Sequence, residues 1–231
     1  MAEYKNYDEQ ISTQINQQLQ AYEILRHRII EFYYKPGERL PTKEIHEELG
    51  IGRTPVRESV VRLQQEGLVF TKPKSGSYVS LIDLKNAECA HFLRSNTERA
   101  VVIECCARRS KADQEALSSC IFDQTRAMHN HDQRAFFSSD NQMHELFYQI
   151  AGRKREWAWL SAGSYDLDRF RWLHVKAKGV SWDSILNEHR HLFEAITQRD
   201  PREASYLITS HLHVMLDEKD EVITSFPEYF K

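Results

Sequence analysis

The sequence predicts a mainly α-helical protein, with an N-terminal winged helix-turn-helix followed by an antiparallel bundle of about six helices. In the first third, helical segments alternate with glycine and proline breaks and end in two short apolar stretches around a basic turn. From residue 86 onward, apolar residues recur at helical spacing, without alternating strands or internal repeats. The 231 residues, 41% of them hydrophobic, suffice for one or two domains with a sizeable core.

The first third contains the elements of a winged helix-turn-helix, expected over residues 1–81. Thr54 and Pro55 mark the start of its third helix, because proline at a helix start gives up no needed hydrogen bond. Two short strands, 68–70 and 78–79, flank the basic turn and form a two-stranded wing. The three helical segments end at breaks rich in glycine or proline and cover residues 22–32, 42–49 and 54–67.

The remainder is expected to be a short linker, 82–86, and an all-helical domain, 87–231. The segment Asp200–Glu203 is a strong helix start, with an acidic cap, proline first and glutamate third. Successive helices joined by short connections favour an antiparallel bundle. The predicted helices lie near residues 86–109, 113–128, 132–150, 156–175, 182–199 and 201–224.

Composition excludes some partners and leaves others open. No apolar run approaches the roughly 18 residues that a membrane span needs, and the polar start lacks a signal-peptide pattern, so a cytoplasmic protein without membrane contact is expected. The net charge is −3, and the first 81 residues carry eleven basic and eleven acidic side chains, so DNA binding must depend on where positive charges lie. The cysteines lack metal-binding spacing and are expected to be reduced packing residues: Cys89, Cys105, Cys106 and Cys120.

Positive charges gather where such a fold meets DNA. Arg53, Thr54 and Arg57 lie at the start of the predicted third helix, whose N-terminal end contacts base edges in this motif. Arginine can pair with guanine through two hydrogen bonds, and Thr54 with the free backbone N–H groups can hold a phosphate. Lys72 and Lys74 in the wing turn can reach the DNA backbone or the minor groove. Taken alone, the two arginines are equally well explained as solvated helix charges.

Three segments of the C-terminal half carry polar groups on apolar helix faces. Asp140 and His144 are four residues apart and share a face, and His189 and His211 lie on the apolar faces of two later helices. Burying one carboxylate and three imidazoles is costly unless they are paired or ligating, and a divalent metal satisfies all four at once. The nitrogen-rich set suits zinc first, and also nickel, manganese or iron. For each histidine alone, a hydrogen-bonded core residue is the commoner explanation.

The N-terminal pattern resembles the GntR family of bacterial transcription factors. The resemblance implies that Arg53, Thr54 and Arg57 are the main DNA contacts, with Lys43 and Gly76 as weaker ones. Gly52 replaces a serine often found before the arginine, and His46 stands where the family often has alanine. The matching residues are Leu25-Arg26, Ile29-Ile30, Lys35-Pro36-Gly37-Glu38-Arg39-Leu40, Glu44-Ile45, Gly50-Ile51, Arg53-Thr54-Pro55-Val56-Arg57-Glu58, Arg62-Leu63, Glu66-Gly67-Leu68-Val69 and Gly76-Ser77-Tyr78-Val79.

The C-terminal pattern resembles the FCD subfamily, named for the C-terminal domain of FadR-type regulators. Its metal-binding pattern matches Asp140 with His144, Glu188-His189 ahead of Ala195-Ile196, and His211. Arg94 and Glu98 match an Arg-x3-Glu pattern, which implies effector contacts in which the arginine clamps a ligand carboxylate. An ordinary ion pair within the helix explains the same spacing equally well. Arg153-Lys154-Arg155 stands where the family often has asparagine, and a solvated basic corner is the favoured interpretation.

Together these patterns predict a homodimeric transcriptional regulator. Two winged helices would occupy the half-sites of a near-palindromic double-stranded DNA operator, and a small carboxylate or sugar acid would bind beside the metal as effector. The family resemblance favours repression. Two other classes stay open: a metal-dependent hydrolase or lyase-like enzyme, although the sequence lacks HExxH and GxSxG motifs, and a structural DNA-binding protein that acts without a ligand.

Overall fold

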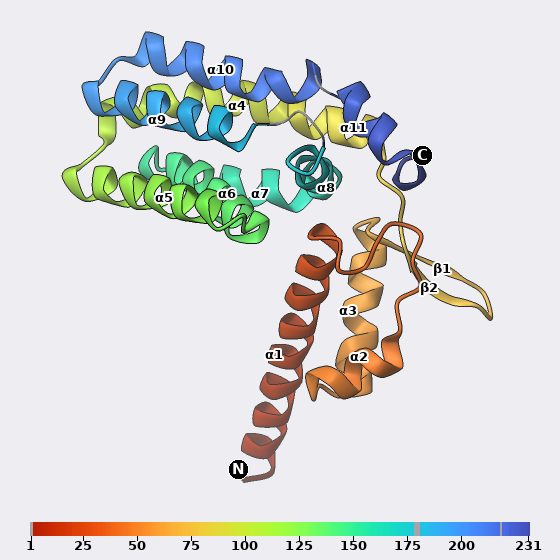
Figure 1. Ribbon diagram of the computed structural model, residues 1–231. Coiled ribbons are helices and arrows are strands. Elements are labelled where there is room, and N and C mark those ends of the chain that lie inside the picture. Colours follow the sequence, from red (N-terminus) through yellow and green to blue (C-terminus); the bar gives the residue numbers. More distant parts are fainter. Residues whose placement is uncertain (1, 178–180, 218) are drawn as a thin grey trace. The chain divides into compact units, whose positions relative to one another are not determined.

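The computed structural model describes residues 2–177, 181–217 and 219–231 (Figure 1). The chain forms two compact units, the first ending at Ile82 and including Glu228–Lys231, and the second running over Asp83–Pro227. The predicted fold class is confirmed, because the first unit is a winged helix-turn-helix and the second is all helical. No helix in the described residues combines the length and the apolar character needed to cross a membrane.

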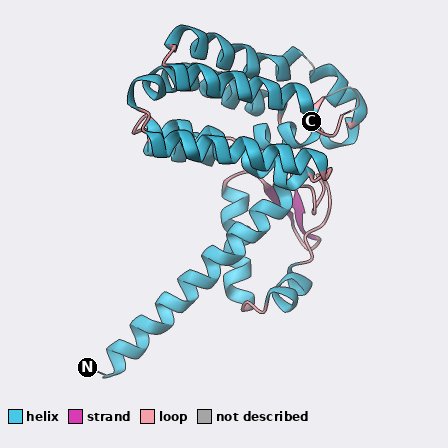
Figure 2. Cartoon of the chain, turned by 60° about the vertical axis from the view of Figure 1, so that its left-hand side comes forward, coloured by secondary structure: helices cyan, strands magenta, loops and turns pink. Residues whose placement is uncertain are grey.

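In the first unit, three helices and a two-stranded antiparallel wing surround a small core (Figure 2). The helix α1 packs along α3, and Leu25, Ile29 and Leu63 are fully buried. Gly50 ends α2 in the left-handed region at φ +63°, where a side chain would be strained. The elements are α1 (Ala2–Ile30), α2 (Thr42–Leu49), α3 (Arg53–Gln65), β1 (Val69–Lys72) and β2 (Gly76–Val79).

The helix α1 is longer than the apolar spacing predicted. It begins at Ala2, whereas the expected segment begins at Tyr22. Residues 2–20 contain no glycine or proline that would stop a helix, but their few apolar residues form no stripe that signals one.

The segment Glu228–Lys231 belongs to the first unit although it lies far away in sequence. The Ile82 N–H donates to the Tyr229 carbonyl at 2.8 Å, and the Lys231 N–H donates to the Ile82 carbonyl at 3.1 Å. The Tyr229 ring lies 5.5 Å from the Phe32 ring. The sequence predicted that these residues belong to the C-terminal domain. It could not predict their pairing with Ile82, because contacts between distant segments leave no pattern in the local sequence.

The second unit begins sooner than predicted. The expected linker, 82–86, is shortened because the Asp83 carboxylate accepts hydrogen bonds from the N–H groups of Lys85 and Asn86 and thereby starts α4 at Leu84. The helices are α4 (Leu84–Arg108), α5 (Lys111–His129), α6 (Gln133–Ile150), α7 (Lys154–Gly163), α8 (Tyr165–His174), α9 (Trp182–Gln198), α10 (Pro201–Asp217) and α11 (Lys219–Ser225), followed by a 3-10 turn (Pro227–Tyr229).

One of the predicted helices is interrupted within the described residues. The segment 156–175 is divided between α7 and α8 at Gly163 and Ser164, both poor helix formers, and the Ser164 hydroxyl donates to the Leu160 carbonyl at 2.6 Å. The segment 201–224 is helical on both sides of residue 218, as α10 and α11, and residue 218 itself lies outside the described residues.

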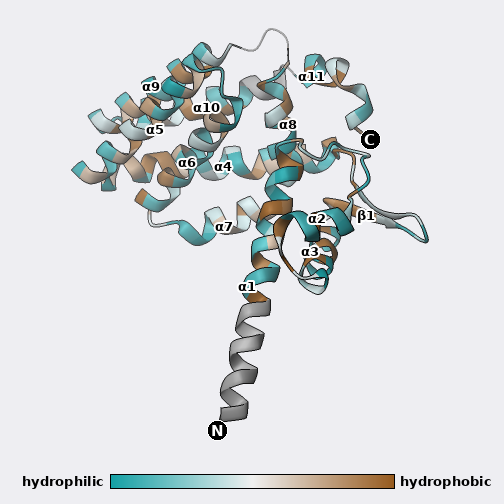
Figure 3. Ribbon diagram, turned by 60° about the horizontal axis from the view of Figure 1, so that its bottom comes forward, coloured by the Kyte–Doolittle hydropathy of each residue, from teal (hydrophilic) through white to brown (hydrophobic). Residues whose placement is uncertain are grey.

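The bundle is built from helix pairs that share one apolar core. The helix α4 packs along α10, α5 along α6, and α9 contacts α4, α5 and α10. Along these helices, apolar residues recur between polar ones (Figure 3). Val102, Phe147, Ile196 and Ile208 are fully buried at the centre of this core. A polar group on an inward face of α6, α9 or α10 is therefore removed from water.

Candidate DNA interface and candidate metal centre

The start of α3 presents the predicted DNA contacts to solvent. Arg53, Thr54 and Arg57 are exposed, whereas Pro55 and Val56 between them are buried and hold the helix in place. On the other side, the Ser59 hydroxyl donates to the Gln18 carbonyl of α1 at 2.8 Å. The helix therefore has one anchored face and one free basic face.

The remaining predicted DNA contacts lie on α2 and on the wing. Lys43 is exposed on α2. Lys74 is exposed in the turn between β1 and β2, and Lys72 lies with its ammonium 4.9 Å from the centre of the Tyr78 ring. Gly76 has φ +117°, and a Cβ there would lie 3.1 Å from the Arg39 Nε. The glycine therefore lets the Arg39 side chain lie against the tip end of the wing, next to its turn.

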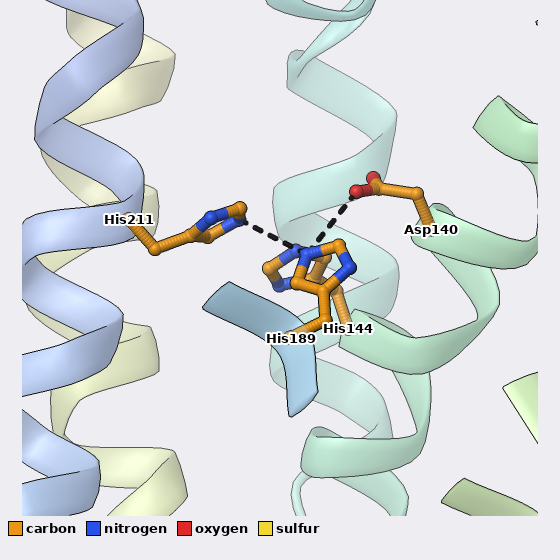
Figure 4. A group of neighbouring side chains, drawn as sticks. All are labelled: Asp140, His144, His189 and His211. Atoms are coloured by element: carbon orange, nitrogen blue, oxygen red, sulfur yellow. Dashed lines mark hydrogen bonds and ion pairs between the residues drawn. The ribbon is translucent and has the colours of Figure 1, made fainter. Parts of the chain in front are cut away.

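The bundle brings the four predicted metal ligands to one place. Asp140 and His144 come from α6, His189 from α9 and His211 from α10, and one ligand atom of each lies within 4.8 Å of the others. Figure 4 shows the three rings and the carboxylate meeting between the helices that carry them. The i, i+4 spacing on α6 places two of these groups on one face, and packing supplies the other two.

Each ring is held from behind by a hydrogen-bond acceptor. The Nδ1 atoms lie 2.7 Å from the acceptor oxygen in all three cases, which assigns the ring proton to Nδ1 and leaves a lone pair on Nε2. The partners are Glu98 for His144, Gln124 for His189 and Glu188 for His211. The Gln124 amide is itself oriented, because its Nε2 donates to the Ser139 carbonyl at 3.3 Å.

The three Nε2 atoms converge with no proton assigned between them. The Nε2 atoms of His189 and His211 are 3.3 Å apart, and the buried Nε2 of His144 has no hydrogen-bond partner in the described part of the chain. One Asp140 oxygen lies 3.4 Å from the His189 Nε2, and the other pairs with the Arg171 guanidinium. Lone pairs and a carboxylate directed at one small space fit a divalent cation.

Burial also favours the protonation states that a metal needs. It lowers the pKa of His144 to about 4 and, together with the neighbouring His211, holds the pKa of His189 well below its usual range. Burial alone would raise the pKa of Asp140, but Arg171 and the nearby rings lower it below its ordinary value. Neutral His144 and His189 and a charged carboxylate are the forms that bind metal.

A cavity opens directly beside this cluster. Asp140 and His211 form part of its wall. Arg94 and Arg171 contribute positive charge to the wall, and Phe136 is among its apolar residues. A small ligand in this cavity can therefore contact the cluster and a guanidinium at once.

Arg94 and Glu98 take different positions relative to the cavity. The Arg94 Nε donates to Glu98 at 2.7 Å, while its buried Nη2 has no hydrogen-bond partner among the described residues. Arg94 lines the cavity, but Glu98, predicted as an effector contact, lies behind it with 0% exposure, between Arg94 and His144. Arg94 can therefore keep its ion pair with Glu98 through Nε and still donate to a ligand through Nη2, because the two interactions use different nitrogens of one guanidinium.

Sequence reasoning missed two residues at this centre. Gln124 lies on the inward face of α5 with Leu117, Cys120 and Ala127, so a polar residue on an apolar stripe was the available signal. Arg171 gave no such signal, because its position depends on the break between α7 and α8.

The helix α3, called the reading helix below, is basic and exposed and lies beside a wing. Together with a helical bundle that has an internal polar cavity, it defines a DNA-binding transcriptional regulator. The family model for bacterial regulatory proteins of the gntR family matches residues 17–79, and the FCD domain model matches residues 91–214. The chain belongs to the gntR family of bacterial regulatory proteins and carries an FCD domain.

Two relatives carry names that agree with this assignment, and one solved structure shares the fold. An HTH-type transcriptional regulator in an unstable DNA locus of Streptomyces ambofaciens is 32% identical, over 89% of this chain and 86% of its own length. The HTH-type transcriptional repressor RspR of Escherichia coli is 27% identical, over 94% and 93% of the two chains. The structure of E. coli McbR/YncC superposes with a TM-score of 0.77 at 16% identity, covering 88% of this chain and 97% of that one, and shows the same fold.

These relationships decide one of the alternatives that the sequence left open. The family and the similar proteins are transcriptional regulators, not enzymes. The hydrolase or lyase alternative is therefore wrong.

Proposed function

We propose that this protein is a homodimeric repressor whose operator affinity is set by a small carboxylate or sugar acid bound beside a divalent metal. The convergence of three histidine Nε2 atoms and Asp140 on the wall of a cavity that also holds the unpaired Arg94 nitrogen is the observation that carries the proposal. DNA contact is assigned to Arg53, Thr54 and Arg57 on α3, with further contacts from Lys43, Lys74 and the Gly76 backbone.

Asp140, His144, His189 and His211 would hold the ion, with zinc as the first choice and nickel, manganese or iron also compatible. A bound ion supplies open coordination positions for ligand oxygens. Glu98, Gln124 and Glu188 fix the rings so that each presents Nε2, and Arg171 holds the second Asp140 oxygen.

The effector is assigned to the cavity by its lining. The unpaired Nη2 of Arg94 can donate to a carboxylate oxygen, and satisfying that buried nitrogen favours an acid over a neutral ligand. Ser181, Ser184 and Glu188 offer further hydrogen-bonding groups for ligand hydroxyls. An acid bound here would contact residues of α4, α6 and α10 together, so it can change how these helices pack.

Dimerisation is assigned to the outward face of α4. Phe92, Leu93 and Ile103 lie on this face with exposures of 66%, 56% and 42%, and Ala100 lies beside them. A second copy of the same helix suits this face, because a two-fold axis brings identical apolar patches together. Repression is proposed because RspR, a relative matched over nearly its whole length, is named a repressor.

Phe92→Glu is expected to convert the dimer into a monomer, because two charges would be buried face to face at the two-fold axis. Sedimentation or light scattering gives the mass, and circular dichroism checks the helical content. Phe122→Glu is the matched control, because Phe122 on α5 is also 66% exposed. A dimer of unchanged stability in Phe92→Glu contradicts the assignment of this face.

Arg94→Lys is expected to lose stabilisation by a carboxylate while keeping stabilisation by metal. Lysine can keep the ion pair with Glu98, but it lacks the separate nitrogen that Arg94 presents to the cavity. Thermal melting with zinc alone, and with zinc plus lactate, malate or gluconate, tests this and the proposed function. If none of these acids raises the melting temperature of the wild type, the effector class is wrong.

A further inference from the structure

The ring of His46 contacts the first arginine of the reading helix. His46 lies on α2, Arg53 begins α3, and the turn Gly50–Gly52 joins the two helices. The Arg53 Nε donates to the His46 Nε2 at 3.1 Å. The His46 side chain is only 19% exposed, so the ring is braced against the protein while its acceptor nitrogen faces the arginine.

This contact uses one part of the guanidinium and leaves the rest free. A hydrogen bond through Nε keeps the N–H groups of Nη1 and Nη2 available, and these can form a two-bond contact with guanine O6 and N7. Because the long Arg53 side chain is already ordered in the free protein, less conformational entropy is lost when DNA binds. An imidazole nitrogen accepts this hydrogen bond without placing a carboxylate on the guanidinium, and the Glu47 carboxylate lies 4.0 Å from the same Nε2.

Arg53 and Arg57 differ in this respect. Arg57, one helical turn further along α3, is exposed and has no such partner within the described residues. The protein therefore orients the Arg53 side chain, whereas no contact of this kind orients Arg57 within the described residues.

We propose that His46 is a specificity-determining residue of operator recognition: it positions Arg53 so that the free edge of the guanidinium reads one guanine in each half-site. The inference rests on the proposed DNA contact of Arg53. Alanine at this position would let the arginine move between base and phosphate partners and would weaken the preference for one base.

The test is selection of bound duplexes from a random DNA library by the full-length chain, followed by binding to single-base variants of the selected site. The variants are His46→Ala, His46→Phe, His46→Gln and Arg53→Ala. His46→Ala and His46→Phe are expected to reduce the guanine preference at one position by about 2- to 10-fold, the range for ordering one side chain in advance. His46→Gln offers an acceptor oxygen and should restore much of the preference, whereas Arg53→Ala should remove it.

The salt dependence of affinity separates positioning from direct contact. His46 variants should keep the wild-type slope of affinity against salt, because no phosphate contact is lost. A wild-type base preference in His46→Ala, with the preference lost in Arg53→Ala, overturns the role of His46 but keeps the Arg53 contact. A preference retained in Arg53→Ala, or no common site selected by the wild type, overturns the contact itself. A lower salt slope in His46→Ala means that the ring binds phosphate, which also overturns the positioning role.

Discussion

Arg57→Ala is expected to remove specific operator binding while the protein stays folded. The Arg57 side chain is exposed at the reading end of α3, so its loss leaves no cavity in the core. Losing a two-bond contact with guanine costs about 1–3 kcal/mol for each arginine, or about 5- to 150-fold in affinity. The proposed dimer would lose two such contacts, so binding should fall to the non-specific level.

Gel-shift or fluorescence anisotropy titration of the selected operator against a scrambled duplex measures this loss. Arg62→Ala is the control, because Arg62 lies on the same helix but pairs with Glu66 and covers the Tyr22 ring. The assignment of the reading helix fails if Arg57→Ala binds the operator as tightly as the wild type.

His211→Ala is expected to abolish tight metal binding, because it removes one of four converging ligands. At a free metal concentration 100 times its Kd, binding stabilises the folded state by about 2.7 kcal/mol, or roughly 5–10 °C in melting temperature for a chain of this size. The wild type should show this shift with zinc, and the variant should not. Metal analysis after dialysis gives the bound stoichiometry directly.

The chain supplies matched controls for this experiment. His213 lies two residues further along α10 and is exposed, and His191 stands in the same relation to His189 on α9. His213→Ala and His191→Ala should retain the metal and the shift. If His213→Ala or His191→Ala loses the bound metal to the same extent as His211→Ala, the metal centre is excluded. The same conclusion follows if the wild type neither binds zinc nor gains stability from it.

What the sequence predicted depended on how local the signal was. Gly50, Thr54 and Pro55 predict the start of the reading helix within a few residues. The spacing of four between Asp140 and His144 predicts that these two ligands share one face of α6. These local predictions hold in the folded protein, because the geometry of a helix alone determines which of its side chains share a face. Packing then brought His189 and His211 to the same place, as four costly inward groups on apolar faces had suggested.

The parts that escaped prediction depend on contacts between distant segments. Glu98 was assigned to the effector because Arg94 and Glu98 match the family's Arg-x3-Glu pattern, but its second buried partner, His144, comes from another helix. Arg171 lies on α8, which begins after the break at Ser164, and it pairs with Asp140 of α6. Neither contact leaves a trace in the local pattern of either segment.

The pairing of Glu228–Lys231 with Ile82 affects how the chain can be divided for experiments. A fragment that stops at Ile82 would leave the Ile82 N–H and carbonyl without their partners and would uncover the Phe32 ring. Such an excised reading module would present fresh apolar surface and unpaired backbone, both of which promote aggregation. Fusing the six residues 226–231 to it through a flexible tether, rather than cutting at the obvious junction, would preserve the complete module.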